Sequence, residues 1–124
     1  MLSGTALETF LACAREAVGG VYCSPAREPA CTDCSGLVRW AYLRVGVELP
    51  HNSYALYGQG RRVSESKLVP GDILFFEGLG HVGLYIGRGR MVHAPETGRN
   101  VEIVRLSGSN YGSRLIGARR VVAA

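Results

Sequence analysis

The stretch CTDCSGLVRW, residues 31–40, carries the side chains best suited to chemistry in this sequence. Cys31 and Cys34 stand at the spacing used for zinc ligation and for thiol–disulfide exchange. Cys34 also opens an apolar run, and a thiol in the first turn of a helix faces unpaired N–H groups and the positive end of the helix dipole, which favour the thiolate. Ser35 and Gly36 are small, so a substrate carbonyl could approach, with their backbone N–H groups near an oxyanion. The stretch therefore fits a metal ligand pair, a redox pair, a buried inert cysteine or a single nucleophile.

A thiol nucleophile needs a general base within hydrogen-bonding reach, and imidazole is the usual one. The sequence holds three histidines, His51, His81 and His93. His51 follows a proline in a polar loop and is expected at the surface. His81 begins a predicted strand directly after EGLG, at an element edge where functional side chains are often displayed. His93 lies in the next predicted strand. Each histidine taken singly is more typical of a structural residue, so their relative placement matters.

That placement depends on the register of the hairpin around the sequence GRG. A three-residue loop with Gly89 in the left-handed conformation puts His93 opposite Gly83, on the same face as His81, with the glycine giving it room. A two-residue turn would pair His93 with Leu84 instead and place it on the other face. The first register alone permits a constellation with the cysteine. In it His81 is the general base, and His93 orients its ring by accepting a hydrogen bond from the second ring nitrogen.

The rival readings of the cysteine pair fit the rest of the chain less well. A zinc site would need further ligands, but Cys13 and Cys23 do not form a second CxxC, and the histidines lack the usual finger spacing. A thioredoxin-like pair would follow a strand, whereas this one follows a Pro-rich loop. Cys31 could pair with Cys23 in an oxidising environment and leave Cys34 free, if their Cα atoms are close enough. No metal and no cofactor is expected.

Two helices are expected in the first half of the chain. Apolar residues at helical spacing predict a helix over residues 5–18, which ends at a Gly-Gly pair. Asp33 can serve as the N-cap of a second helix, which Cys34 opens and Gly46 ends. The side chains expected on the apolar sides of these helices are Leu7, Phe10, Leu11, Ala14 and Val18 in the first, and Leu37, Val38, Ala41, Tyr42 and Val45 in the second.

The second half changes to short strands rich in Val, Ile, Leu and Phe, after a short helical turn and a loop that ends at Pro70-Gly71. Strands are predicted over residues 72–78, 81–87, 90–95, 101–106 and 114–122. Helices followed by antiparallel strands make the expected fold class α+β, with N-terminal helices packed on a sheet of about five strands. With 124 residues the chain is expected to form a single domain, residues 1–124.

Composition limits the class of partner. Apolar residues make up 47% and charged residues 19% of the chain, as in a globular protein. The net charge of +4 is spread along the chain without a basic block interleaved with aromatic residues, so nucleic-acid binding is not expected. No apolar run approaches the roughly 20 residues that a membrane span requires. The N-terminal segment reads as an amphipathic helix and not as a secretory signal.

Several ordered motifs together carry a family resemblance. They are DCSG with an apolar helix, a helix-ending glycine followed by LP, the strand PGDILFF, the strand GHVGLYIG and the strand MVHAP. In order and spacing the chain resembles the NlpC-type, papain-like cell-wall peptidases over roughly residues 5–122. The resemblance implies a minimal papain-like cysteine peptidase core.

Carried over to this sequence, the resemblance implies Cys34 as nucleophile, His81 as base and His93 as the third polar residue. It further implies Tyr22 as a hydroxyl near the oxyanion, and Asp33 and Ser35 as contacts to the substrate. The sequence departs from the family just after Tyr22, where CSPAREPACT stands in place of Trp-Gly-Gly. The shape of the substrate groove on that side is therefore expected to differ.

The implied reaction is hydrolysis of an amide bond in peptidoglycan stem peptides, most often between D-γ-glutamate and a diamino acid, through a thioester on Cys34. A wall-fragment binding domain, an amidase and an acyltransferase of the same fold are the alternatives. Without a signal peptide, such a domain is expected to reach the bacterial cell wall by lysis, in a phage particle or by non-classical secretion, or as a fragment of a secreted protein. A phage lysin, a tail-associated peptidase or another larger lysin, virion or secretion assembly would be the setting.

Overall fold

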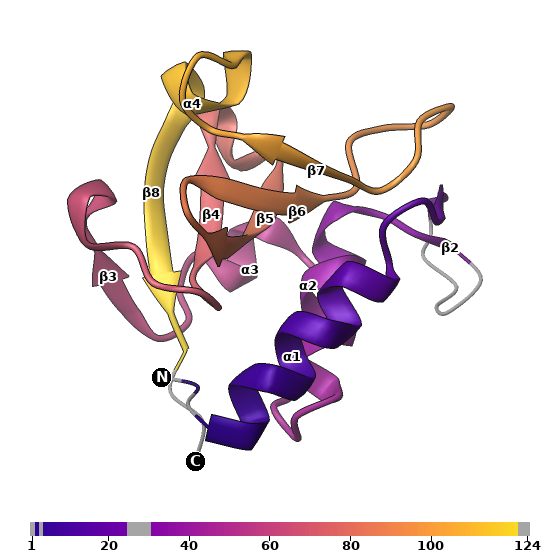
Figure 1. Cartoon of the computed structure of the whole chain (residues 1–124). Coiled ribbons are helices and arrows are strands. Elements are labelled where there is room, and N and C mark those ends of the chain that lie inside the picture. The colour runs from indigo at the N-terminus through magenta and orange to yellow at the C-terminus, as the bar shows by residue number, and fades with distance from the viewer. Residues whose placement is uncertain (1, 3, 25–30, 122–124) are drawn as a thin grey trace.

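The structure, a computed structural model, describes residues 2, 4–24 and 31–121. Helices come first and the main sheet second, which confirms the α+β fold class (Figure 1). The predicted loop at residues 25–30 and the last residue of the final predicted strand lie outside the described residues. The helices are α1 (Gly4–Glu16), α2 (Cys34–Leu43), α3 (Ser53–Leu56) and α4 (Asn110–Arg114), with 3₁₀ turns η1 (Glu65–Lys67) and η2 (Glu77–Leu79). The strands are β1 (Val21–Tyr22), β2 (Cys31–Thr32), β3 (Arg61–Val63), β4 (Ile73–Phe76), β5 (Val82–Gly87), β6 (Arg90–His93), β7 (Glu102–Arg105) and β8 (Leu115–Arg120).

The main sheet has the order β3-β8-β4-β5-β6-β7, with antiparallel neighbours throughout. It therefore has six strands where about five were predicted. The additional strand is β3, an edge strand paired with β8, and its sequence RRV lacks the apolar alternation that marks a strand. Its pairing partner lies more than fifty positions away, so only the tertiary fold reveals it. A separate pair of two-residue strands, β1 and β2, runs parallel.

Both predicted helices form, and their ends follow local chemistry. Asp33 is the N-cap of α2, where its Oδ1 accepts the backbone N–H of Gly36 at 2.7 Å. Gly46, with φ of +80°, follows the helix in the left-handed conformation. In α1 Phe10 and Ala14 are fully buried, whereas Val18 is 39% exposed because the helix ends at Glu16. The prediction that Val18 belongs to the apolar side of the first helix is therefore wrong.

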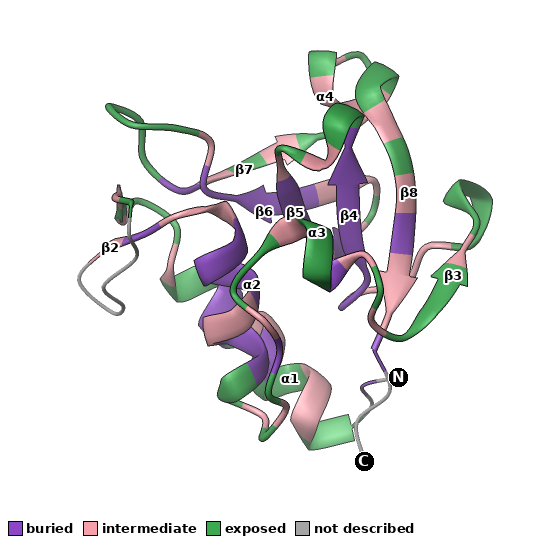
Figure 2. Ribbon diagram, turned by 180° about the vertical axis from the view of Figure 1, so that it is seen from behind, coloured by how far each residue is buried: buried purple, intermediate pink, exposed green. Residues whose placement is uncertain are grey.

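The main core lies between the helices and one face of the sheet, and Figure 2 shows the buried residues gathered in α2 and in β4, β5 and β6. Fully buried side chains of α1, α2 and the central strands pack there, among them Phe10, Val38, Phe75 and Leu84. A smaller cluster of Leu74, Phe76, Met91 and Ala118 fills the opposite face. Strands β4 to β6 are therefore buried on both faces.

The hairpin between β5 and β6 has the register that brings the two histidines together. Leu84 pairs with Val92, and a Cβ added to Gly83 would lie 3.4 Å from the Cβ of His93. The turn itself has two residues, Arg88 and Gly89, both with positive φ, as in the second of the two alternatives considered from the sequence. A β-bulge between Tyr85 and Gly87 leaves one residue of β5 without a partner in β6. Beyond the bulge the pairing is that of the first alternative, so His93 lies on the same face as His81.

A buried ion pair fixes the start of β4 against β8. Asp72 is 1% exposed, and its two carboxylate oxygens accept hydrogen bonds from Arg120 at 2.8 and 2.9 Å. The backbone N–H of Val69 donates to the same carboxylate at 2.9 Å. The hydroxyl of Tyr42, in α2, donates to the carbonyl of Gly71. The Pro-Gly-Asp turn is thus tied to the last strand and to the second helix.

Candidate active site

Cys34 begins α2 and faces the start of β5. Backbone amides lie toward its sulfur from Val82, from Ser35 and from Cys34 itself. Val82 directly follows His81, so the helix N-terminus and the base-bearing strand meet at the thiol. The helix start and the strand edge named from the sequence are therefore brought together.

The thiol of Cys34 is protonated more readily than its position in a helix suggests. Burial raises its pKa above the ordinary value and the negative charge of Asp33 adds to this, although the three backbone amides lower it. The backbone amides at the helix N-terminus favour the thiolate, as expected, but loss of solvation outweighs them in the resting protein. Any reaction in which this thiol acts as a nucleophile therefore needs a base that takes its proton.

His81, His93 and Glu102 form one line of hydrogen bonds. Nε2 of His81 lies 2.7 Å from Nδ1 of His93, and Nε2 of His93 lies 2.8 Å from Oε2 of Glu102. His93, at the end of β6, is completely buried, and Glu102, at the start of β7, is paired with it across the sheet. The predicted contact between the two histidines is present. Glu102 was not singled out from the sequence.

Burial also sets the charge of the two imidazoles. Desolvation lowers the pKa of His81 to about 4, and the charges of His93 and Arg114 lower it further, against the attraction of Glu102. Desolvation lowers the pKa of His93 as well, while its hydrogen bond to Glu102 acts in the opposite direction. Both rings are neutral at pH 7, so His81 can accept a proton.

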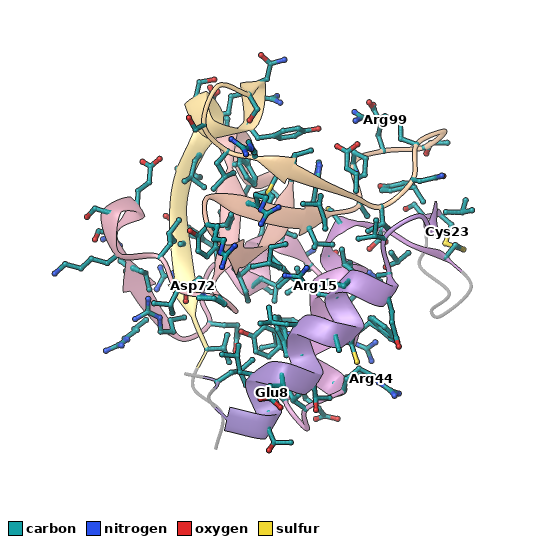
Figure 3. The ribbon with its side chains drawn as sticks, in the orientation of Figure 1. Glu8, Arg15, Cys23, Arg44, Asp72 and Arg99 are labelled. Atoms are coloured by element: carbon teal, nitrogen blue, oxygen red, sulfur yellow. A yellow bond between two sulfur atoms is a disulfide. The ribbon has the colours of Figure 1, made fainter. Side chains whose placement is uncertain are left out.

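Two aromatic rings pack against the histidines, and an arginine binds the carboxylate of Glu102. The ring of Tyr111, in α4, lies edge-on to His93 at 4.6 Å between centroids, and Phe76 lies 5.6 Å from His81. A guanidinium nitrogen of Arg99 donates to both carboxylate oxygens of Glu102, at 2.9 and 3.0 Å. Figure 3 shows Arg99 on the loop that leads into β7, at the edge of the sheet away from Asp72.

The turn before His81 is fixed by α3. Leu79 has a positive φ of 56°, uncommon for a residue with a branched side chain. The hydroxyl of Ser53 donates to the carbonyl of Leu79, and the hydroxyl of Tyr54 donates to the carbonyl of Gly78 at 3.2 Å. These two bonds hold the reversal of the chain that places the base at the edge of β5.

Tyr22, in β1, lies close enough to Cys34 for the charge of the thiolate to raise the pKa of the phenol, after burial as the larger cause. Its backbone is paired with Thr32 of β2, and the next residue, Cys23, forms a disulfide with Cys31 at a Cα separation of 5.6 Å. The proposed pairing of Cys23 with Cys31 is thus present, and Cys31 does not form a pair with Cys34. Cys34 and the buried Cys13 are the free thiols of the chain.

The remaining predicted site residues surround the start of α2. Asp33 Oδ1 accepts from Gly36 and also lies 2.8 Å from Nε2 of His51. His51 is exposed, as predicted, yet it is part of the site through this contact. The amide of Gly36 is used by Asp33, so it is not free for an oxyanion. Ser35 is 9% exposed and offers little side-chain surface to a substrate.

Comparison with known proteins agrees with this geometry. The sequence profile of the NlpC/P60 family matches residues 19–120, most of the chain. The chain belongs to the NlpC/P60 family. A curated relative, the probable endopeptidase p60 of Listeria monocytogenes, is 36% identical over 115 residues, which are 90% of this chain and 23% of that protein.

Solved structures of the family match over almost the whole chain. An NlpC/P60 family protein from Bacillus cereus has a TM-score of 0.88 at 30% identity, over 98% of this chain and 42% of that one. The NlpC/p60 domain of the peptidoglycan hydrolase SagA has a TM-score of 0.81 at 27% identity, over 93% of this chain and 98% of that one. These likenesses confirm the predicted family and its fold. The chain spans about a quarter of the length of the curated p60 relatives it matches.

Glu102 and Tyr111 contact His93 and are the residues of this candidate site that sequence reasoning missed. A signal for Glu102 was available, since an acidic residue at the start of a strand next to the His93 strand can reach it once the register is known. Tyr111 had no such signal, because α4 is a five-residue helix placed only by the tertiary fold. Within the described part of the chain, no group of three or more His, Cys, Asp or Glu side chains is arranged to hold a metal ion. Nor is any helix there long and apolar enough to cross a bilayer.

Proposed function

We propose that this domain is a cysteine endopeptidase that hydrolyses an amide bond in peptidoglycan stem peptides, with Cys34 as nucleophile and His81 as base. The observation that carries the proposal is the meeting of Cys34, at the N-terminus of a helix, with the start of β5, which the neutral, hydrogen-bonded His81 directly precedes. Family membership and the naming of the SagA relative as a peptidoglycan hydrolase support the substrate class.

The reaction begins from a neutral pair, because burial raises the pKa of Cys34 and lowers that of His81. His81 takes the thiol proton as the sulfur attacks the amide carbon, and a tetrahedral intermediate forms. The imidazolium then gives this proton to the leaving amine, which leaves a thioester on Cys34. His81 next activates a water, which hydrolyses the thioester and regenerates the thiol.

The oxyanion of each tetrahedral intermediate needs hydrogen-bond donors. The backbone N–H of Cys34 and the hydroxyl of Tyr22 are the proposed donors, since the amide lies toward the sulfur and the Tyr22 phenol is near enough for the charge of Cys34 to raise its pKa. Loss of one such donor typically costs on the order of 10²-fold in rate. Asp33, with His51 bound to it, is proposed to contact the acyl part of the substrate on the same side of the thiol.

The leaving amine is proposed to lie in a groove of about 270 Å³ on the other side of the site, because His81 lines this groove. Glu77, Glu96 and Arg114 line it as well. Carboxylates can bind an ammonium group, and a guanidinium can bind a carboxylate in two-point contact. A diamino acid carries such groups, so the charges of the groove support a D-γ-glutamyl–diamino acid bond as the cleaved bond.

Action outside the cytoplasm agrees with the disulfide between Cys23 and Cys31, because disulfides form and persist in oxidising compartments. We therefore propose the bacterial cell wall as the place of action. A larger lysin, virion or secretion assembly remains the proposed setting.

The test is digestion of purified peptidoglycan and of defined muropeptides, with new termini identified by mass spectrometry. The wild-type protein should release products with a free amine on the diamino acid, and Cys34→Ala should reduce this release by about 10⁴-fold or more. Cys13→Ala removes the other free thiol and serves as the matched control, with unchanged activity expected.

Products that Cys34→Ala also releases would contradict the peptidase proposal. New termini at the bond between the sugar and the first amino acid would instead identify an amidase. Binding of muropeptides without any new terminus would identify a wall-fragment binding domain.

A further inference from the structure

Glu102 differs from an ordinary surface carboxylate in what it contacts. It is 29% exposed, and one oxygen lies 2.8 Å from Nε2 of the completely buried His93. The other ring nitrogen of His93 lies 2.7 Å from His81. The carboxylate is thus connected to the proposed base through one imidazole and touches neither the base nor the thiol directly.

We infer that Glu102, held by Arg99, is a positioning residue that fixes the tautomers of His93 and His81 and so leaves the free lone pair of His81 on Nδ1, the nitrogen available to Cys34. The inference rests on the proposed function only for the role of that lone pair. The tautomers themselves follow from the hydrogen bonds.

The direction of each bond follows from its acceptor. A carboxylate can only accept, so Nε2 of His93 carries the proton that is donated to Glu102. Nδ1 of the neutral His93 is then without a proton and accepts from Nε2–H of His81. Nδ1 of the neutral His81 is left without a proton and keeps its lone pair. One carboxylate at the surface therefore sets the protonation pattern of two rings.

Without the carboxylate, the opposite pattern becomes available. His93 could carry its proton on Nδ1 and donate it to Nε2 of His81, and His81 would then hold its own proton on Nδ1. With its proton on Nδ1, the nitrogen proposed to serve Cys34, His81 could not accept the thiol proton there. The buried position of His93 leaves Glu102 as the hydrogen-bond partner described for its Nε2.

Arg99 and Tyr111 hold the carboxylate in place. The guanidinium of Arg99 binds both oxygens of Glu102, and its contacts with Glu102 and with the hydroxyl of Tyr111 raise its own pKa. The ring of Tyr111 packs edge-on against His93. The backbone carbonyl of Arg99 accepts from the N–H of Tyr22, at 3.4 Å, so the same loop reaches the other side of the thiol.

The charged and titratable groups around the two rings come from several elements. Glu102 comes from β7, Arg99 from the preceding loop, Arg114 and Tyr111 from α4, and Cys34 from α2. Arg114 and Arg99 each lower the pKa of one imidazole, and Glu102 raises that of both. Without Glu102 the two arginines would still lower the pKa values of the imidazoles, and nothing from the carboxylate would raise them. Both rings would therefore stay neutral. A change in tautomer is the expected result, not a change in charge.

The direct test is nitrogen-15 NMR of the histidine rings, which distinguishes a protonated from an unprotonated ring nitrogen without any substrate. In the wild-type protein both His81 and His93 should carry the proton on Nε2. Glu102→Leu should shift a measurable fraction of His93 to the Nδ1–H form, whereas Glu102→Gln should keep most of the wild-type pattern because its amide oxygen can still accept.

Kinetics supply the second readout. Glu102→Leu should lower kcat by about ten- to hundredfold with little change in KM, and Glu102→Gln should recover most of this loss. Arg99→Gln should lower kcat by a few-fold, because the carboxylate remains but is held less well. Arg105→Gln is the matched control, an exposed arginine on the same strand β7, and should leave kcat unchanged. Thermal unfolding of each variant checks that the fold is kept.

Wild-type tautomers and wild-type kcat in a folded Glu102→Leu protein would overturn the inference. Loss of kcat without any change in the tautomers would overturn it as well, since Glu102 would then act by another route. If Glu102→Leu fails to fold, the ring spectra of Arg99→Gln and Glu102→Gln test the inference. A large change of tautomer in Glu102→Gln would contradict the role of Glu102 as hydrogen-bond acceptor. Failure of the proposed peptidase activity is recognised separately, because the wild-type ring spectra do not depend on it.

Discussion

Two carboxylates in different parts of the sheet, Asp72 before β4 and Glu102 in the edge strand β7, are each bound by an arginine but differ in their other contacts. Asp72 is 1% exposed, and the bonds described for it come from Arg120 and a backbone amide. Glu102 is 29% exposed and is bound by Arg99, yet it also accepts from His93. Figure 3 shows Asp72 and Arg99 well apart.

The difference lies in where each network ends. The network of Asp72 is closed, since its oxygens bind groups whose only role is to join β4, β8 and the turn before β4. The network of Glu102 is open, because it passes through His93 to His81, whose second ring nitrogen has no partner in it and is proposed to serve Cys34. Closed networks of this kind contribute to the stability of a fold, and open ones place protons for chemistry. Variants of each network should therefore change different measured quantities.

The largest expected effect belongs to the open network. His81→Ala should lower kcat by about a thousandfold or more, because it removes the base, while His93→Ala should leave a residue of activity, because it removes only the group that orients the base. Thermal unfolding should show that the His81→Ala protein is folded. Equal, full activity in both variants would show that the base lies elsewhere.

The closed network should give the next largest effect, on stability. Asp72→Asn leaves the guanidinium of Arg120 without its charged partner and should lower the free energy of unfolding by about 3 kcal/mol, or the Tm by about 10 °C. Below the unfolding transition the kcat should stay within about twofold. Glu96→Gln is the matched control for a solvent-exposed pair with Arg99, and should change the Tm by about 1 °C or less. A large loss of kcat in the folded Asp72→Asn protein would remove the distinction between the two networks.

The smallest expected effect is a shift of the acidic limb of the kcat/KM profile to lower pH. The pKa of His81 is lowered to about 4, so kcat/KM should hold as the pH falls through 6.5 and decline only well below it. Stability should behave differently, because the unfolded chain takes up a proton on this histidine near pH 6.5 while the folded protein does so near pH 4. The free energy of unfolding should therefore fall as the pH is lowered between these values. A loss of kcat/KM centred on the ordinary pKa of histidine would contradict the buried, neutral state of the base.

Local chemistry made much of the site predictable. Asp33 could be read as an N-cap and Cys34 as the first helical residue, because both depend on neighbours in the sequence. That His81 and His93 could share a face was apparent from one short hairpin, although the sequence left two registers open and did not show the bulge that decides between them. These features need no knowledge of how distant segments meet.

The parts that were not predicted depend on distant segments. The pairing of β3 with β8 joins residues nearly sixty positions apart, and β3 has no apolar pattern of its own. Tyr111 reaches His93 only because α4 folds back over the sheet. The raised pKa of Cys34 depends on burial by the whole fold, which no motif records. Glu102 is intermediate between these cases. Its contact with His93 can be predicted only when the registers of the β5–β6 hairpin and of the next strand, β7, are both known.

The β-bulge in the β5–β6 hairpin has a consequence for insertions and deletions during evolution. Because the bulge at Ile86 holds one residue outside the ladder, a deletion there would leave a regular two-residue turn with His93 still on the face of His81. A hairpin without such a residue would lose this alignment when its length changed by one. The bulge thus lets the length of this hairpin vary while the two histidines stay in line.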